Sequence, residues 1–238
     1  IDIALDPLEG TTLTATGGNN ALAVIAFSTE GGLLNAPDTY MDKIAVGGGL
    51  PNGVIDLDAD PGDNIRELAK AKSCNPSDII ACILSRPRHE EMIAKVREAG
   101  ASIRLIPDGD IAGVIATATP KTGIDIYMGT GGAPEGVLAA AALRSIGGQM
   151  QGRLVFRNDD ERTRARRVGI EDLDAKYDLD QLASGDVIFT ATGVTDGWML
   201  DGVHRDGDAV TTHTLVMRSK TGTVRWIKAR HAAGKVNS

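Results

Sequence analysis

The sequence is poor in aromatic residues, which occupy 3% of its 238 positions. So few rings leave little material for stacking on nucleic acid bases. The sequence also lacks an excess of positive charge, because its formal net charge is −7. A nucleic acid backbone requires a basic surface, so we expect no nucleic acid partner. A small phosphorylated substrate remains compatible with this charge, because a bound metal ion supplies positive charge locally.

Cysteine is equally scarce, with Cys74 and Cys82 as the two examples and no metal-type spacing between them. Such sparse cysteine is typical of a reducing compartment, and we expect a cytoplasmic protein. No apolar run approaches the eighteen residues of a membrane-spanning helix, so we expect no membrane partner. The rest of the composition, 42% hydrophobic and 24% charged, is that of a globular protein with a substantial core.

The most informative stretch follows an apolar run at residues 1–5 and reads Asp6-Pro7-Leu8-Glu9-Gly10-Thr11-Thr12. We expect Pro7 to stop a strand and Gly10 to permit a tight turn. The carboxylates of Asp6 and Glu9 then offer the oxygen ligands that Mg²⁺ or Mn²⁺ prefers. Thr11 would present a hydroxyl beside the metal, and the N–H groups of the turn would face a phosphate. An isolated Asp-Pro-x-Glu-Gly, without the residues that follow, is explained equally well as a turn with two solvated acids.

Between residues 79 and 146 the order strand, loop and helix occurs three times. Apolar runs predict strands at 79–84, 102–106 and 124–128, and helical spacing predicts helices at 89–99, from 111 onward, and at 137–146. This alternation predicts an α/β fold with a largely parallel sheet. Ligands bind at the carboxyl ends of the strands in such sheets, so we expect the three loops to build one site.

The flanking regions contain further expected elements. A buried strand is predicted at 21–28, a short strand at 54–57, and a helix over 63–72 with Asp60 as its N-cap and Pro61 at its first position. The glycine-rich segment 47–53 is a loop, a hairpin or a boundary between lobes. The last ninety residues predict strands at 151–157, 186–192, 209–218 and 223–230, with a charged, solvated helix over 159–169.

The three loops of the middle region carry unusual residues. Arg86-Pro87-Arg88 supplies two guanidinium groups that can grip a phosphate, although a surface basic pair is the simpler explanation. Asp108-Gly109-Asp110 can accept hydrogen bonds from sugar hydroxyls, or serve only as a helix cap and turn. The loop 129–135 is rich in glycine and suits an anion, and Glu135 stands in the first turn of the following helix. Tyr40 is best explained, from the residues alone, as a half-buried core residue.

Taken together and in this order, these strings resemble the class II fructose-1,6-bisphosphatases over essentially the whole chain. The family is part of the lithium-sensitive, metal-dependent sugar and inositol phosphatases, whose Asp-Pro-hydrophobic-Asp/Glu-Gly-Thr/Ser signature the first stretch matches. This sequence has Glu9 where the signature often has a second Asp, and in this respect it resembles the class II branch. The tract Asp38-Thr39-Tyr40-Met41-Asp42-Lys43 and the loop Gly131-Gly132-Ala133-Pro134-Glu135-Gly136 extend the resemblance.

The resemblance implies a role for each matching residue. The implied metal ligands are Asp6, Glu9 and Glu135, for Mn²⁺ or Mg²⁺, and the implied catalytic groups are Asp6, Glu9 and Thr11. The implied substrate contacts, including Tyr40 against its interpretation as a core residue, are Glu9, Gly10, Thr11, Tyr40, Arg86, Pro87, Arg88, Asp108, Gly109, Asp110 and Gly132.

The implied reaction is hydrolysis of the 1-phosphate of fructose-1,6-bisphosphate to fructose 6-phosphate, in gluconeogenesis or the Calvin cycle. Sedoheptulose-1,7-bisphosphate is a second implied substrate, and an inositol-monophosphatase-like enzyme or a non-catalytic sugar-phosphate-binding relative is the alternative. The implied fold is a layered α/β/α/β/α arrangement with mixed sheets, in a homo-oligomer, either a dimer or a tetramer.

We expect residues 1–50 to form part of the metal-binding lobe, residues 51–150 an α/β lobe with the substrate loops, and residues 151–238 a strand-rich part that completes the sheets. The family also has an earlier segment that supplies an Asp and a Glu to a metal and a Lys near the substrate. Because this sequence opens within a strand-like run, we expect that an N-terminal portion is missing or processed.

Overall fold

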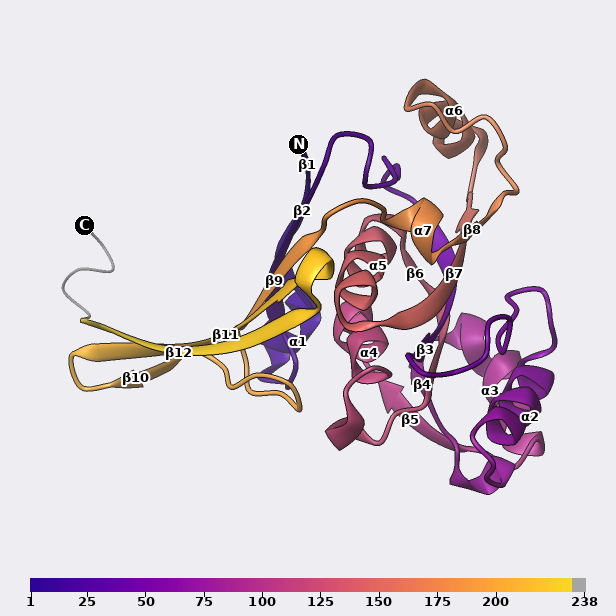
Figure 1. Cartoon of the computed structure of the whole chain (residues 1–238), viewed down its shortest axis with the longest axis horizontal. Coiled ribbons are helices and arrows are strands. Elements are labelled where there is room, and N and C mark those ends of the chain that lie inside the picture. Colours follow the sequence, from indigo (N-terminus) through magenta and orange to yellow (C-terminus); the bar gives the residue numbers. More distant parts are fainter. Residues whose placement is uncertain (233–238) are drawn as a thin grey trace.

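Two six-stranded sheets organise the chain, and a pair of helices lies between them (Figure 1). The computed structural model describes residues 1–232. Among these residues, no helix has both the length and the apolar character needed to cross a membrane.

The first sheet has the strand order β1-β2-β9-β11-β10, and β12 pairs with β11. Neighbouring strands are antiparallel, and the β11–β12 hairpin extends away from the helices (Figure 1). The strands are β1 (Asp2–Glu9), β2 (Leu22–Ser28), β9 (Ile188–Gly193), β10 (His204–Asp206), β11 (Ala209–Arg218) and β12 (Thr223–Ala232).

The second sheet is mixed and has the order β5-β4-β6-β3-β7-β8. Strand β4 runs parallel to β5 and β6, whereas β3 is antiparallel to β6 and β7. Its strands are β3 (Tyr40–Gly47), β4 (Ile80–Leu84), β5 (Ser102–Ile106), β6 (Ile126–Gly132), β7 (Gly148–Val155) and β8 (Lys176–Asp178). The expectation of a largely parallel sheet therefore holds for β4, β5 and β6 and is wrong for the other half.

The helices cover both faces of the second sheet. Helices α4 (Asp110–Ala116) and α5 (Ala133–Ile146) lie between the sheets, and α2 (Pro61–Ala71) and α3 (Glu90–Glu98) cover the opposite face. The layers run β/α/β/α, which are four consecutive layers of the expected arrangement, so the α/β fold class is confirmed. The remaining helices are α1 (Thr11–Thr16), α6 (Asp159–Arg167) and α7 (Leu179–Leu182).

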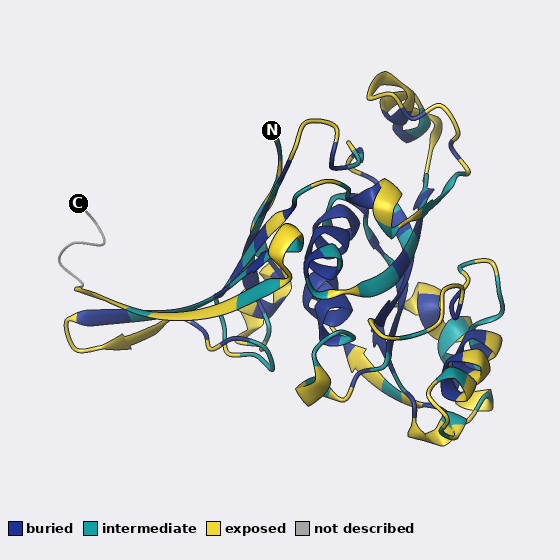
Figure 2. Ribbon diagram, in the orientation of Figure 1, coloured by how far each residue is buried: buried dark blue, intermediate teal, exposed yellow. Residues whose placement is uncertain are grey.

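Helix α5 forms the centre of the larger core and is the most continuously buried element in Figure 2. Its run of four alanines, 139–142, is fully buried because small side chains let two sheets approach one helix. Gly136 has the same function nearer the N-terminus, where an added Cβ would lie 2.6 Å from Met41 Sδ. This close packing fixes the N-terminal end of α5 against β3, beside the loops that carry the candidate site residues.

Most elements lie where the sequence places them, with local differences. Asp60 caps α2 as expected, by accepting the Gly62 N–H at 2.8 Å. Two expectations are wrong: residues 54–57 form no strand, although Val54 and Ile55 are buried, and β1 continues through Pro7 to Glu9. Pro7 is tolerated because the β1–β2 register shifts between Asp6 and Glu9, and β1 lies at the edge of its sheet.

Candidate active site

The sequence-predicted residues gather around one cavity of about 320 Å³. It lies where the ends of β1 and β4, the start of β3, the loop after β5 and the junction of β6 with α5 meet. Eleven of the thirteen predicted residues line it, and the exceptions are Pro87 and Gly109. The full lining is Asp6, Leu8, Glu9, Gly10, Thr11, Tyr40, Leu84, Arg86, Arg88, Asp108, Asp110, Gly131, Gly132 and Glu135.

The Asp-Pro motif is shaped by local contacts at the end of β1. Asp6 Oδ1 accepts the Leu8 N–H at 2.9 Å, which holds the strand end in a bend. Gly10 has φ +81°, and an added Cβ would lie 2.8 Å from Leu13 Cδ1. Only glycine satisfies both conditions without strain, so this position directs Thr11 into the first turn of α1 at the cavity edge.

Glu9 is the most deeply buried acid of the motif, with 3% of its surface exposed. Its Oε1 accepts the Ile111 N–H of α4 at 2.6 Å, whereas its Oε2 has no hydrogen-bond partner among the described residues. Burial raises the pKa of Glu9 well above its usual value, and the negative charges of Asp110, Asp6 and Glu135 add to that rise. The local environment therefore lacks positive charge at Glu9 Oε2.

Glu135 presents a second unsatisfied acid to the same cavity. It stands in the first turn of α5, and its Oε2 is buried without a partner in the described part of the chain. Burial also raises the pKa of Glu135. Its carboxylate folds back over Gly132, where an added Cβ would lie 1.8 Å from Oε2. The glycine before α5 is thus explained by the position of Glu135.

These acids fit a divalent cation in part. Two buried oxygens without partners are costly unless a cation or water satisfies them, and Mg²⁺ and Mn²⁺ prefer oxygen ligands. Within residues 1–232, however, no three His, Cys, Asp or Glu side chains form a ready-made metal cluster. The arrangement suits an ion that keeps waters and takes substrate phosphate oxygens beside one or two carboxylates.

The basic side of the cavity is formed by the loop after β4. Arg86 donates to the Pro107 carbonyl at 2.5 Å and lies 3.8 Å from Asp108, so two loops are joined by one side chain. Arg88 donates to the Thr130 carbonyl at 2.6 Å and lies over the Tyr40 ring, 5.0 Å from its centroid. Tyr40 lines the same cavity, and its ring contacts a candidate phosphate-binding arginine. The substrate contact that the resemblance implies for Tyr40 stays a prediction.

Two residues important to the geometry were given no role at the sequence level. Lys43 is 2% exposed and forms an ion pair with Asp110. His89 is buried between β4 and β6, contacting the Leu84 carbonyl through Nδ1 and the Thr130 N–H through Nε2. The available signal for Lys43 was a charged residue directly before the apolar run at residues 44–46. No signal in the sequence indicated the structural role of His89, because its two hydrogen-bond partners lie at the end of β4 and on β6.

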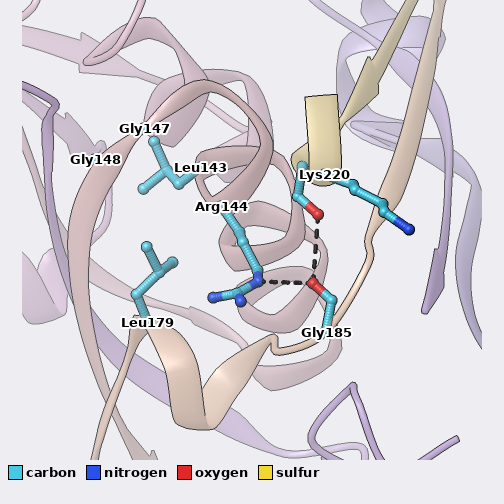
Figure 3. A pocket seen from close by; sticks show the side chains of 8 residues that line it. Leu143, Arg144, Gly147, Gly148, Leu179, Gly185 and Lys220 are labelled. Atoms are coloured by element: carbon cyan, nitrogen blue, oxygen red, sulfur yellow. Dashed lines mark hydrogen bonds between the residues drawn. The ribbon is translucent and has the colours of Figure 1, made fainter. Parts of the chain in front are cut away.

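A second cavity, of about 340 Å³, lies at the C-terminal end of α5 (Figure 3). Arg144 crosses it and donates to the Gly185 carbonyl at 3.2 Å, and its guanidinium pairs with Asp180. None of the residues that line this cavity is an acid, and none belongs to the motifs of the sequence. It therefore offers no place for the expected metal chemistry.

Comparisons with known proteins identify the family of this chain. A family model described as bacterial fructose-1,6-bisphosphatase, glpX-encoded, matches residues 1–231. Fructose-1,6-bisphosphatase 1 class 2 of Escherichia coli strain K12 is 43% identical over 244 aligned residues, which cover 97% of this chain and 72% of the relative. A class 2 fructose-1,6-bisphosphatase of Shigella flexneri has the same identity and coverage. The chain therefore belongs to the family of bacterial, glpX-encoded class II fructose-1,6-bisphosphatases.

Proposed function

We propose that this chain is a phosphoric monoester hydrolase that converts fructose-1,6-bisphosphate to fructose 6-phosphate and inorganic phosphate. The observation that carries the proposal is one cavity lined both by the acids of β1 and α5 and by two arginines. The acids, at β1 and α5, suit metal-assisted attack on one phosphate. Arg86 and Arg88 suit a second phosphate that is bound and not cleaved.

The metal-holding residues in this proposal are Asp6, Glu9 and Glu135. Mn²⁺ or Mg²⁺ at these carboxylates would neutralise the phosphoryl oxygens and lower the pKa of a bound water. The partnerless oxygens of Glu9 and Glu135 support this assignment, since each is a buried carboxyl oxygen without a hydrogen-bond partner among the described residues.

In this proposal, the protein's own side chains perform the remaining steps. The Thr11 hydroxyl, at the mouth of the turn, orients the attacking water for in-line displacement, and a neighbouring carboxylate accepts its proton. Asp108 and Asp110 accept hydrogen bonds from the sugar hydroxyls, and Tyr40 borders the same space. Arg88 would bind the second phosphate, and its bond to the Thr130 carbonyl, which restricts the guanidinium, supports this role.

The test is phosphate release from fructose-1,6-bisphosphate with Mn²⁺, Mg²⁺ or EDTA. We expect metal-dependent release that Asp6→Asn abolishes and that Asp63→Asn, an exposed acid on α2 paired with Arg66, leaves unchanged. Sedoheptulose-1,7-bisphosphate and inositol phosphate, assayed in parallel, separate a broader bisphosphatase and an inositol phosphatase from the proposed enzyme. Binding of the bisphosphate without any turnover would instead indicate a non-catalytic relative.

We also propose a cytoplasmic homo-oligomer, either a dimer or a tetramer. Exposed apolar side chains on one face of the first sheet support it: Ile3 (57%), Leu5 (58%), Ile188 (37%) and Ile227 (45%). An apolar face of this kind is typical of an interaction surface. Sedimentation of the purified chain tests the proposal, and a monomer at micromolar concentration would contradict it. The division of roles among residues 1–50, 51–150 and 151–238 stays a prediction.

A further inference from the structure

Lys43 is a charged residue in the middle of a buried strand. It lies on β3, between β6 and β7, and is one of the largest fully buried side chains of the described chain. Two glycines leave the space for it: an added Cβ would lie 3.2 Å from its Cδ at Gly136 and 3.0 Å from its Nζ at Gly131. The Lys43 side chain therefore packs closely against both β6 and α5.

The Lys43 ammonium joins the N-terminal end of α4 to the C-terminal end of β6. It forms an ion pair with Asp110, the first residue of α4, and donates to the Gly132 carbonyl at 2.9 Å. Asp110 and Gly132 both line the cavity, whereas Lys43 does not. Its contacts with the cavity are therefore indirect, through a carboxylate and a peptide group.

Stability alone does not explain this ion pair. Burying both charges is costly, and well-packed apolar residues of similar volume often serve a fold equally well. What an apolar pair would not provide is a carboxylate held in one orientation at the cavity wall.

We propose that Lys43 is a positioning residue for sugar recognition: it fixes Asp110 so that this carboxylate can accept a hydrogen bond from a substrate hydroxyl. The proposal rests on the proposed function, because it takes a sugar bisphosphate as the ligand. It adds a residue that touches no substrate atom and acts through Asp110. The phosphate-binding end of the cavity, at Arg86 and Arg88, should be independent of it.

The test uses Lys43→Met and the double variant Lys43→Met/Asp110→Asn, which leaves no unpaired buried charge. Both are assayed for the KM of fructose-1,6-bisphosphate and for competitive inhibition by inorganic phosphate. Each variant should lose the hydrogen bond from a substrate hydroxyl to a fixed, charged Asp110, so we expect the KM of fructose-1,6-bisphosphate to rise by roughly tenfold to a hundredfold. Inhibition by phosphate, which lacks the sugar, should change by less than about threefold.

The matched control is Lys72→Met, which breaks a lysine–aspartate pair with Asp125 away from the cavity and should leave both constants unchanged. Equal losses of sugar bisphosphate and phosphate affinity would overturn the proposal, because they would indicate a general structural role. An unchanged KM in a folded variant would overturn it too. Failure of the parent chain to release phosphate or bind the bisphosphate would instead refute the proposed function itself.

Discussion

His89 should make the stability of this chain depend on pH in the neutral range. Since the Thr130 N–H can only donate, Nε2 must accept its bond at 2.8 Å. Nδ1 then carries the proton and donates to the Leu84 carbonyl at 2.7 Å. Protonation would turn Nε2 into a second donor facing the Thr130 N–H, so the fold requires the neutral imidazole.

The pKa of His89 is lowered chiefly by burial, because the side chain is 1% exposed. Arg88 and Arg86 lower it further, while the bond to Leu84 and the charge of Asp42 oppose them. A depressed pKa means that the unfolded chain binds the proton first as the pH falls. The contribution to stability is therefore full above about pH 6.5, the unfolded value, and falls by about 1.4 kcal/mol per pH unit until the folded pKa is reached.

His89→Gln separates this contribution from all others. A glutamine amide has a donor and an acceptor but does not place them where the two ring nitrogens lie, so the variant should lose about 1–3 kcal/mol at pH 7.5. The variant has no titrating group here, so its deficit relative to the parent chain should shrink as the pH falls below 6.5. Urea unfolding at pH 7.5, 6.5 and 5.5 measures this difference, with His231→Gln as the exposed control. A deficit that stays constant over this range would refute the assignment of a neutral His89.

Three further outcomes follow from the structure. Gly131→Ala would place a Cβ 2.2 Å from Asp110 Oδ2, so we expect a loss of about 1–3 kcal/mol in thermal unfolding and weaker sugar bisphosphate binding. Burial raises the pKa of the Cys82 thiol to about 12, so iodoacetamide at pH 8 should label Cys74 and spare Cys82 in mass spectra of the folded chain. Arg157 lowers the pKa of Glu161 to about 2. The stability that the ionised Glu161 contributes should therefore be present above about pH 4.5 and lost toward pH 2. Glu161→Gln should remove this pH dependence from acid unfolding curves.

The elements that could be predicted from sequence are those with a local signal. Helix α2 has a cap, a proline at its first position and an apolar face, and the hairpin of β11 and β12 has a glycine turn. The prediction of a strand at residues 54–57 was wrong because the apolar side chains there are buried without strand pairing. Strand pairing depends on partners that are distant in the sequence. Helix α1 was not expected, because threonine-rich sequence is a weak helix signal and its position depends on Gly10.

The candidate site was predictable as a set of residues and not as a geometry. Each motif lies at the end of a strand, and sheet order brings those ends together, so most of the predicted residues do line one cavity. Lys43 and His89 could not be assigned from sequence, because their roles exist only through partners on other strands. A single sequence does not specify which of its buried polar groups meet.

The negative charge of the cavity bears on how the substrate binds. Five carboxylates line it beside two arginines, Arg86 and Arg88, and the buried Lys43 pairs with one of the five, Asp110. A sugar bisphosphate adds about −1.5 to −2 charges with each phosphate, so its entry into this excess of negative charge is unfavourable without added cations. Metal should therefore support substrate binding and not only the chemical step. EDTA-treated chain is expected to bind fructose-1,6-bisphosphate at least about tenfold more weakly in calorimetry than chain loaded with Mn²⁺. Equal affinity in both conditions would mean that the arginines alone outweigh the acids, and that the partnerless oxygens of Glu9 and Glu135 are satisfied in another way.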